Sequence, residues 1–345
     1  CGGCQWQHIA YERQAELKAD IVRDQLRRLG GLEDPPVLDT VALADDDGIV
    51  DFGYRNHTQF AISPDGELGY MRADSHDVIP IDRCMLLCEQ IDELFGALDV
   101  SWPELVGVSV RAGIHTGEAM IVFESSGGEQ PELELDLPAA CVLKTPQGVQ
   151  PLIGEPWLGE EVNGKAFRVS SGSFFQVNTL GAQALVDIVT EYLAPSPTDV
   201  LLDAYCGVGL FALSLADVVG EVIAIESSPS ACEDFAVNAG ERLNVVLHEG
   251  NVEDVLAALA AQDQRTDLVV LDPPRSGAGK TVVQSLAQLR PSKIVYVSCD
   301  PATLARDLAH LTEAGYRLTV VQPVDMFPQT YHIESVACFE KSPAH

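Results

Sequence analysis

The sequence predicts a two-domain protein, in which a doubly wound, Rossmann-like α/β domain is joined to a smaller, sheet-rich α+β domain. The chain has 345 residues, more than one ordinary core encloses. From Ser173 onward, short apolar runs alternate with helical stretches, as in a parallel sheet covered by helices. Between Val37 and about Ser170, apolar runs alternate instead with turn signals such as Asp47-Gly48 and Asp65-Gly66, which indicates an antiparallel sheet.

The individual elements follow from local patterns along the chain. An amphipathic helix is predicted over 11–29, where Gly30-Gly31 ends it, and a second helix over 84–98. In the last half, buried strands are predicted at 200–202, 221–225, 244–247, 267–271 and 293–297, with helices that begin near Gly209, Ser230, Val252, Thr281 and Pro301. The segments 316–323 and 335–340 are expected to form two final strands that pair with each other.

The composition is strongly acidic, with 52 Asp and Glu residues against 21 Lys and Arg and a net charge of -31. This balance argues against a polyanionic ligand, because nucleic-acid binders usually carry a basic footprint. The acidic composition would be compatible with a nucleic-acid ligand if a basic domain were lost from the N-terminus, or if the acidic surface were suited to a high-salt cell. Because the first residue is not Met, we expect the chain to be a fragment of a longer protein.

Cysteine usage bears on the compartment. Nine cysteines without secretory features indicate a reducing environment, so we expect a cytoplasmic location and thiols that bind metals or do chemistry. No apolar stretch is long enough to span a bilayer. A monomer is the expected oligomeric state.

A strand, a glycine turn and a helix over 200–212 form the pattern of a nucleotide-type cofactor pocket. Gly207 and Gly209 let the backbone pass close to a ligand, and Glu226, at the end of the next strand, is positioned for ribose hydroxyls. NAD and S-adenosylmethionine folds share this pattern, and a glycine turn that merely packs a helix on a sheet is a third interpretation. Asp272, in an acidic-proline turn (DPPR) after the fourth strand, favours S-adenosylmethionine, although a proline pair can also simply terminate a loop.

Cys299 and Glu334 supply the two groups that methylation of uracil carbon 5 requires. Carbon 5 becomes nucleophilic only after a thiolate adds to carbon 6, and a base must then remove the carbon 5 proton. Cys299 follows a strand and precedes Asp300-Pro301 at a helix N-terminus, a position that tends to lower the pKa of a thiol. Alone, such a cysteine is more often a buried apolar residue and such a glutamate a solvated one. Their occurrence together with Asp272 at one sheet edge favours the catalytic interpretation.

Five stretches, in this order, resemble the RNA 5-methyluridine methyltransferases, a class I S-adenosylmethionine-dependent family that acts on tRNA or 23S ribosomal RNA. The resemblance covers nearly the whole chain and rests on SFFQVN (173–178), DAYCGVG (203–209), LDPPRSG (271–277), VSCDP (297–301) and TYHIE (330–334). It implies that Cys299 is the nucleophile and Glu334 the proton acceptor. It further implies contacts to S-adenosylmethionine by Gln176, Tyr205, Glu226, Asn251 and Asp272. Asp300 departs from the family's usual Asn and, as a second charge beside the thiol, could raise its pKa.

The resemblance also implies an iron–sulfur site and a domain division. Members of the family often hold a [4Fe–4S] cluster, and Cys1, Cys4 and Cys84 match three of its four thiolates, with the fourth expected before residue 1. Cys88 is more consistent with the core. The implied division places residues 1–4 and 37–172 in the iron–sulfur and central RNA-binding domain and residues 5–36 and 173–345 in the methyltransferase domain. A small N-terminal RNA-binding barrel is expected to be missing.

The predicted reaction is methylation of carbon 5 of a flipped-out loop uridine in RNA, with 23S rRNA slightly favoured over tRNA. Two alternatives stay open. One is methylation of a protein or small molecule, which needs no covalent adduct. The other is an inactive iron–sulfur RNA-binding module, which the acidic charge leaves possible.

Overall fold

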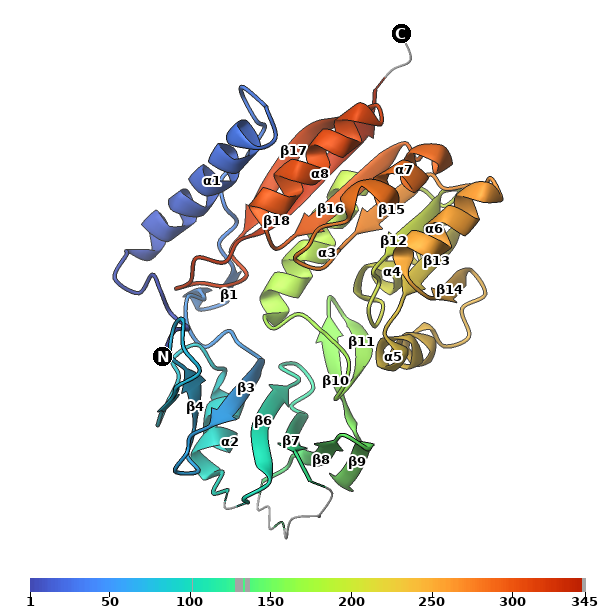
Figure 1. The fold of residues 1–345 in the computed structure, drawn as a ribbon. Helices are drawn as coiled ribbons and strands as arrows, with labels where there is room; N and C mark the ends of the chain where they lie inside the picture. Colours follow the sequence, from blue (N-terminus) through green and yellow to red (C-terminus); the bar gives the residue numbers. More distant parts are fainter. Residues whose placement is uncertain (101, 128–132, 134–136, 343–345) are drawn as a thin grey trace.

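A seven-stranded sheet forms the centre of the larger domain in the computed structural model, which describes residues 1–100, 102–127, 133 and 137–342 (Figure 1). Its strands lie in the order β14-β13-β12-β15-β16-β18-β17. The first five are parallel, whereas β18 pairs antiparallel with both β16 and β17. The bounds are β12 (Val200–Ala204), β13 (Glu221–Glu226), β14 (Val245–Glu249), β15 (Leu268–Leu271), β16 (Lys293–Ser298), β17 (Tyr316–Val324) and β18 (Glu334–Lys341). The predicted doubly wound domain and the pairing of its two final strands are confirmed.

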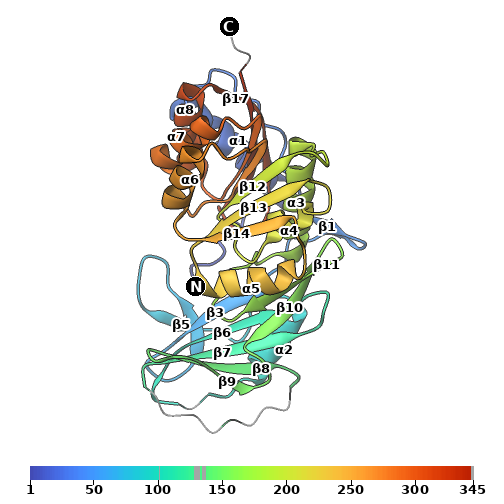
Figure 2. The same ribbon diagram turned by 90° about the vertical axis from the view of Figure 1, so that its right-hand side faces the viewer.

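Helices cover both faces of this sheet, because alternate residues of each buried strand point to opposite sides. Leu201 contributes to the hydrophobic core shared with α3, α4 and α5, whereas Leu202 contributes to the core shared with α1, α6, α7 and α8. Figure 2 shows α6 to α8 on one side of the sheet and α3 and α4 on the other. The bounds are α1 (Tyr11–Arg28), α3 (Thr179–Leu193), α4 (Leu210–Leu215), α5 (Pro229–Ala239), α6 (Val252–Ala261), α7 (Gly279–Leu289) and α8 (Pro301–Glu313).

The smaller domain is built on a second seven-stranded sheet, with the order β5-β4-β3-β6-β7-β8-β9. Its pairs are antiparallel except β7 and β8, which run parallel. The helix predicted over 84–98 begins only at Glu89, because Met85 and Leu86 form a turn and Leu87 bridges to Arg55. The bounds are β3 (His57–Ile62), β4 (Leu68–Met71), β5 (Val78–Pro80), α2 (Glu89–Ala97), β6 (Leu105–Ala112), β7 (Ala119–Ser125), β8 (Ala140–Thr145) and β9 (Gly148–Ile153).

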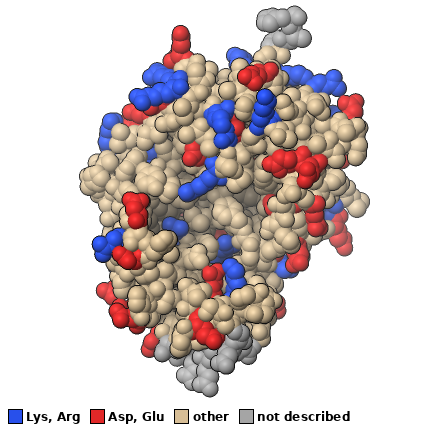
Figure 3. Space-filling view, in the orientation of Figure 1, with Lys and Arg blue, Asp and Glu red and all other residues tan. Residues whose placement is uncertain are grey.

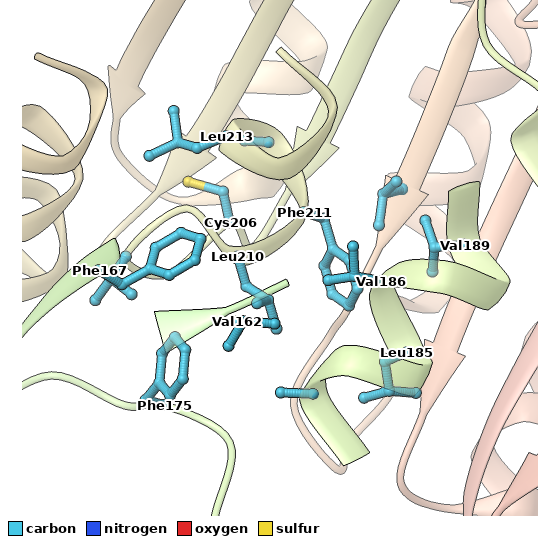
Figure 4. Close-up of a cluster of buried hydrophobic side chains, with 14 of the residues drawn as sticks. Val162, Phe167, Phe175, Leu185, Val186, Val189, Cys206, Leu210, Phe211 and Leu213 are labelled. Carbon is cyan, nitrogen blue, oxygen red and sulfur yellow. The ribbon is translucent and has the colours of Figure 1, made fainter. Parts of the chain in front are cut away.

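A hairpin, β10 (Trp157–Val162) and β11 (Lys165–Ser170), joins the two domains. Val162 and Phe167 of this hairpin pack with residues of α3 and α4 in one apolar cluster (Figure 4). Val37 and Val41 bridge to β17 of the large sheet, ahead of the short pair β1 (Ala44–Asp45) and β2 (Gly48–Ile49). We therefore propose that the sheet-rich domain begins after residue 41 rather than at residue 37. Among the described residues, no helix has the length and apolar character needed to cross a membrane.

Candidate active site

The carboxyl edge of the large sheet gathers the predicted cofactor residues. Ala204, the last residue of β12, is paired with Ile225 of β13 on one side and with Leu271, the last residue of β15, on the other. Tyr205, Glu226 and Asp272, which come next in the three strands, therefore lie at the same edge. This is the edge at which doubly wound sheets bind ligands. Asp272 is partly buried there, and burial raises the pKa of its carboxyl group to about 7.

The glycine turn after β12 adopts the backbone conformations that its sequence predicts. Gly207 and Gly209 have φ values of 56° and 103°, in the left-handed region that glycine occupies without strain. A Cβ atom at Gly209 would lie 2.6 Å from a methyl carbon of Leu213, whereas one at Gly207 would meet no atom within 4 Å. Gly209 is therefore required for packing, and Gly207 leaves space above the turn. Tyr205 also has a positive φ, 70°, and such strain tends to occur at functional sites.

Glu226 ties the glycine turn to the end of β13. Its carboxylate accepts hydrogen bonds from the backbone N–H groups of Gly207 (2.9 Å), Ser227 (2.7 Å) and Ser228 (2.8 Å). Because a carboxylate has about four acceptor positions, it can still accept a bond from a ligand hydroxyl. Asn251 lies near Glu226, because the N–H of the preceding Gly250 donates to the carbonyl of Glu226 at 2.8 Å. The Asn251 side chain is exposed.

Gln176 lies in the loop between β11 and α3, where the two domains meet. Its side chain is buried, and its backbone carbonyl accepts a hydrogen bond from the Asn56 amide at 3.3 Å. Ser173, in the same loop, is fixed by a 2.6 Å hydrogen bond to Asp234 of α5. Asn178 donates to the carbonyl of Met326 at 3.1 Å, so this loop also touches the segment that precedes Glu334.

Cys299 and Glu334 face each other across β16 and β18. Because Ser298 is paired with Ser335 in an antiparallel register, the next opposing positions are 299 and 334. The Glu334 carboxylate lies near enough to raise the pKa of the Cys299 thiol. Glu334 is buried, whereas Cys299 is partly accessible. The fold thus brings together the predicted nucleophile and the predicted base.

The pKa of the Cys299 thiol is raised to about 11, opposite to the direction that its position beside a helix N-terminus predicted. Burial is the main cause, and the carboxylates of Glu334 and Asp272 add to it. Asp300 instead caps α8, because its carboxylate accepts from the N–H groups of Ala302 (2.8 Å) and Thr303 (2.9 Å). Burial and the charge of Asp272 also raise the pKa of Glu334 well above its ordinary value.

Arg275 is a functional candidate that the sequence prediction missed, although it stands in the DPPR stretch. Its charge lowers the pKa of both Cys299 and Glu334, against the effect of burial. The exposed guanidinium therefore favours the thiolate and the carboxylate that the two catalytic steps need.

We expect Arg275→Met to reduce activity at neutral pH by about threefold to tenfold and to move the alkaline rise of the rate to higher pH. The reason is that the pKa of the thiol rises further when the cation is lost. The pH profile of single-turnover methyl transfer measures this, and Arg275→Lys, which keeps the charge, should largely preserve the profile. An unchanged profile in Arg275→Met would contradict the electrostatic role.

The predicted cluster cysteines line one cavity of about 380 Å³ at the boundary of the smaller domain. Cys1, Cys4 and Cys84 share it with Arg55 and Tyr70. Burial raises the pKa of Cys4, and the nearby Cys84 adds to this. Within the described part of the chain, however, no group of three or more His, Cys, Asp or Glu side chains is arranged to hold a metal ion. The cluster therefore stays a prediction. Cys88 is buried in the core, as expected.

A hollow lies near the centre of the face shown in Figure 3, and several Lys and Arg side chains lie in and around it. The net charge of the chain is nevertheless -31. A local concentration of cations can attract a polyanion despite an acidic total, because the Debye length at physiological salt is only about 8 Å.

The chain is similar to known RNA methyltransferases. Residues 158–342 match the family model described as tRNA (Uracil-5-)-methyltransferase. An uncharacterized RNA methyltransferase of Streptomyces coelicolor is 40% identical over 99% of this chain and 76% of its own length. One from Staphylococcus aureus is 33% identical over 98% of this chain and 82% of its own. The crystal structure of Pyrococcus abyssi tRNA (uracil-54, C5)-methyltransferase with S-adenosyl-L-homocysteine superposes with a TM-score of 0.78, at 26% identity, over 98% of this chain and 85% of that one.

Proposed function

Because the chain belongs to the tRNA (uracil-5-)-methyltransferase family, we propose that it transfers the methyl group of S-adenosylmethionine to carbon 5 of a uridine in RNA through a covalent enzyme–RNA adduct. The observation that carries this proposal is the opposition of Cys299 and Glu334 across β16 and β18, beside the glycine turn and Asp272. Methylation of a nitrogen atom or a hydroxyl group needs no covalent enzyme adduct, so it would not need a thiol next to a carboxylate.

The proposed reaction has three steps, and residues of this chain act in the first and the last. The Cys299 sulfur bonds to carbon 6 of the uracil, and the electron pair of the 5,6 double bond is delocalised over carbon 5 and the carbonyl oxygen. Carbon 5 then forms a bond to the methyl group supplied by S-adenosylmethionine, while the methyl–sulfur bond breaks and S-adenosylhomocysteine is the leaving group. Glu334 finally removes the proton from carbon 5, the double bond forms again, and the thiolate leaves.

The cofactor residues have complementary tasks in this proposal. Glu226 would accept hydrogen bonds from the ribose, and the open space above Gly207 would let the cofactor approach the backbone. Tyr205, Gly209, Gln176, Asn251 and Asp272 complete the proposed pocket. The similar Pyrococcus abyssi enzyme was solved in complex with S-adenosyl-L-homocysteine, the demethylated form of this cofactor, which supports the assignment.

The proposed substrate is a loop uridine of tRNA or 23S rRNA, because the base must leave its stack to reach a thiol in a pocket. The slight preference for 23S rRNA from the sequence stands against the similar Pyrococcus abyssi enzyme, which is a tRNA (uracil-54, C5)-methyltransferase. Mapping of 5-methyluridine in both RNAs from cells that lack the gene tests the proposal. Loss of one methyl group, restored by the intact gene but not by a Cys299→Ala copy, is expected; unchanged maps of both RNAs would contradict it.

We also propose that Cys1, Cys4 and Cys84 are ligands of a [4Fe–4S] cluster, which their shared cavity supports. Iron and acid-labile sulfide should be found in protein purified without oxygen, and Cys84→Ser should lower both. Cys141→Ser, at a buried cysteine of β8 that does not line this cavity, should not lower either. Absence of iron and sulfide from the wild type would remove this proposal without affecting the methylation chemistry.

A further inference from the structure

The loop 325–333 connects β17 to β18, and both of its ends lie at the proposed base. Val324, the last residue of β17, is the ladder partner of Glu334, the first residue of β18. A displacement of the loop that reaches either end would therefore shift Glu334 relative to Cys299, which follows the neighbouring strand β16. In Figure 1 this loop lies beside the N-terminal segment that leads into α1.

Gln14 of α1 is a buried side chain that binds this loop at two atoms. Its amide nitrogen donates to Oε1 of Gln329 at 2.9 Å, and its own oxygen accepts from the backbone N–H of Gln329 at 2.9 Å. Gln329 has a φ of 66°, a conformation that a non-glycine residue holds only when its surroundings fix it. Trp6 adds a third bond, from its backbone N–H to the carbonyl of Gln329 at 3.0 Å.

Lys18, one helical turn further on, forms a fully buried ion pair with the first residue of the loop. Its ammonium group lies 2.6 Å from Asp325, and neither side chain is exposed to solvent. It also donates to the carbonyl of Phe327 at 3.0 Å. A buried ion pair adds little net stability compared with apolar packing, so its specific effect is to fix geometry.

A residue that precedes the sheet of the smaller domain also holds this loop. The hydroxyl of Tyr54 donates to the carbonyl of Pro328 at 3.0 Å, and this contact is buried. Hydrogen bonds from Trp6, Gln14, Lys18, Tyr54 and Asn178 thus reach residues 325–329 from segments that lie far away in the sequence.

We propose that the N-terminal segment Trp6–Lys18, together with Tyr54, positions Glu334 for proton removal by clamping the loop 325–333. This inference rests on the proposed function, because it assigns the segment to one step of that reaction. Gln14, Lys18 and Tyr54 are positioning residues: they act through the loop and contact neither cofactor nor base. Had α1 only to cover the sheet, apolar residues such as Val22 and Leu26 would suffice.

The proposal predicts that the clamp affects only the last step, elimination, and not the addition of the thiol or the methyl transfer. Two RNA substrates report these stages separately. A 5-fluorouridine RNA accepts the thiol and the methyl group, but fluorine cannot leave as a cation, so its adduct reports only the first two steps. Uridine RNA with a labelled methyl donor reports elimination, through the decay of methylated adduct in a single turnover. The variants are Gln14→Met and Tyr54→Phe. The matched control is Tyr316→Phe, because the buried Tyr316 hydroxyl also donates to a proline carbonyl, that of Pro291 at 3.0 Å.

We expect both clamp variants to form the 5-fluorouridine adduct at the wild-type rate and to eliminate roughly tenfold more slowly, so that methylated adduct accumulates on uridine RNA. Tyr316→Phe should match the wild type in both assays. Elimination at the wild-type rate in Tyr54→Phe, or equal slowing of both assays, would overturn the proposal even if Gln14→Met failed to fold. A wild-type protein that forms no 5-fluorouridine adduct would overturn the proposed function itself, and this inference with it.

Discussion

Cys299→Ala is expected to lower methyl transfer to uridine by roughly four orders of magnitude or more, because carbon 5 then has no route to a nucleophilic state. The alanine variant should still bind S-adenosylmethionine, since the glycine turn follows β12 and Glu226 ends β13, whereas Cys299 follows β16. Single-turnover transfer of a labelled methyl group measures the loss, and calorimetry measures retained cofactor binding.

Cys141→Ala provides the matched control for this loss. Cys141 is a buried cysteine of β8 in the sheet of the smaller domain, so its replacement removes a sulfur atom without changing the sheet that carries Cys299. We expect its turnover to equal that of the wild type. If Cys299→Ala kept even a tenth of the activity, the thiol could not be the nucleophile.

Glu334→Gln should have the opposite effect on the adduct: RNA should remain bound to the protein through denaturing electrophoresis. The amide cannot accept the carbon 5 proton, so elimination stops after methyl transfer. Addition should persist, because the charge of Glu334 raises the pKa of Cys299 and its removal makes the thiolate more available. At pH values where Glu334 is ionised, we therefore expect Glu334→Gln to form the adduct faster than the wild type.

Glu340→Gln is the control for this change, since Glu340 lies on the same strand but is partly exposed near its far end. Its product should leave the enzyme normally. A double variant, Cys299→Ala with Glu334→Gln, should form no adduct. The assignment of Glu334 as the base would be refuted by rapid release of methylated RNA from Glu334→Gln.

Much of the larger domain was predictable because its parallel strands are buried on both faces and therefore appear as continuous apolar runs. β12, β13 and β15 begin within a residue of the expected positions. The start of α2 was not predictable, because apolar Met85, Leu86 and Leu87 fit a helical pattern, whereas the bridge from Leu87 to Arg55 depends on a distant segment.

The candidate site also has features that the sequence predicts and features that it does not. Strand ends and short motifs identified Cys299, Glu334 and Asp272, because such positions follow from the order of strands in a doubly wound sheet. The direction of the thiol pKa shift did not follow, since it depends on burial and on charges from other strands. The contacts of Gln14 with Gln329 join residues 315 positions apart, a separation for which the sequence carries no local signal.

The most direct test of the covalent mechanism is mass spectrometry of the RNA adduct of Glu334→Gln, after digestion with a protease and a nuclease. We predict that a single peptide, the one that contains Cys299, carries the mass of a uridine nucleotide plus one methyl group. A nucleotide attached to any other residue, or attached to Cys299 without a methyl group when S-adenosylmethionine is present, would contradict the mechanism.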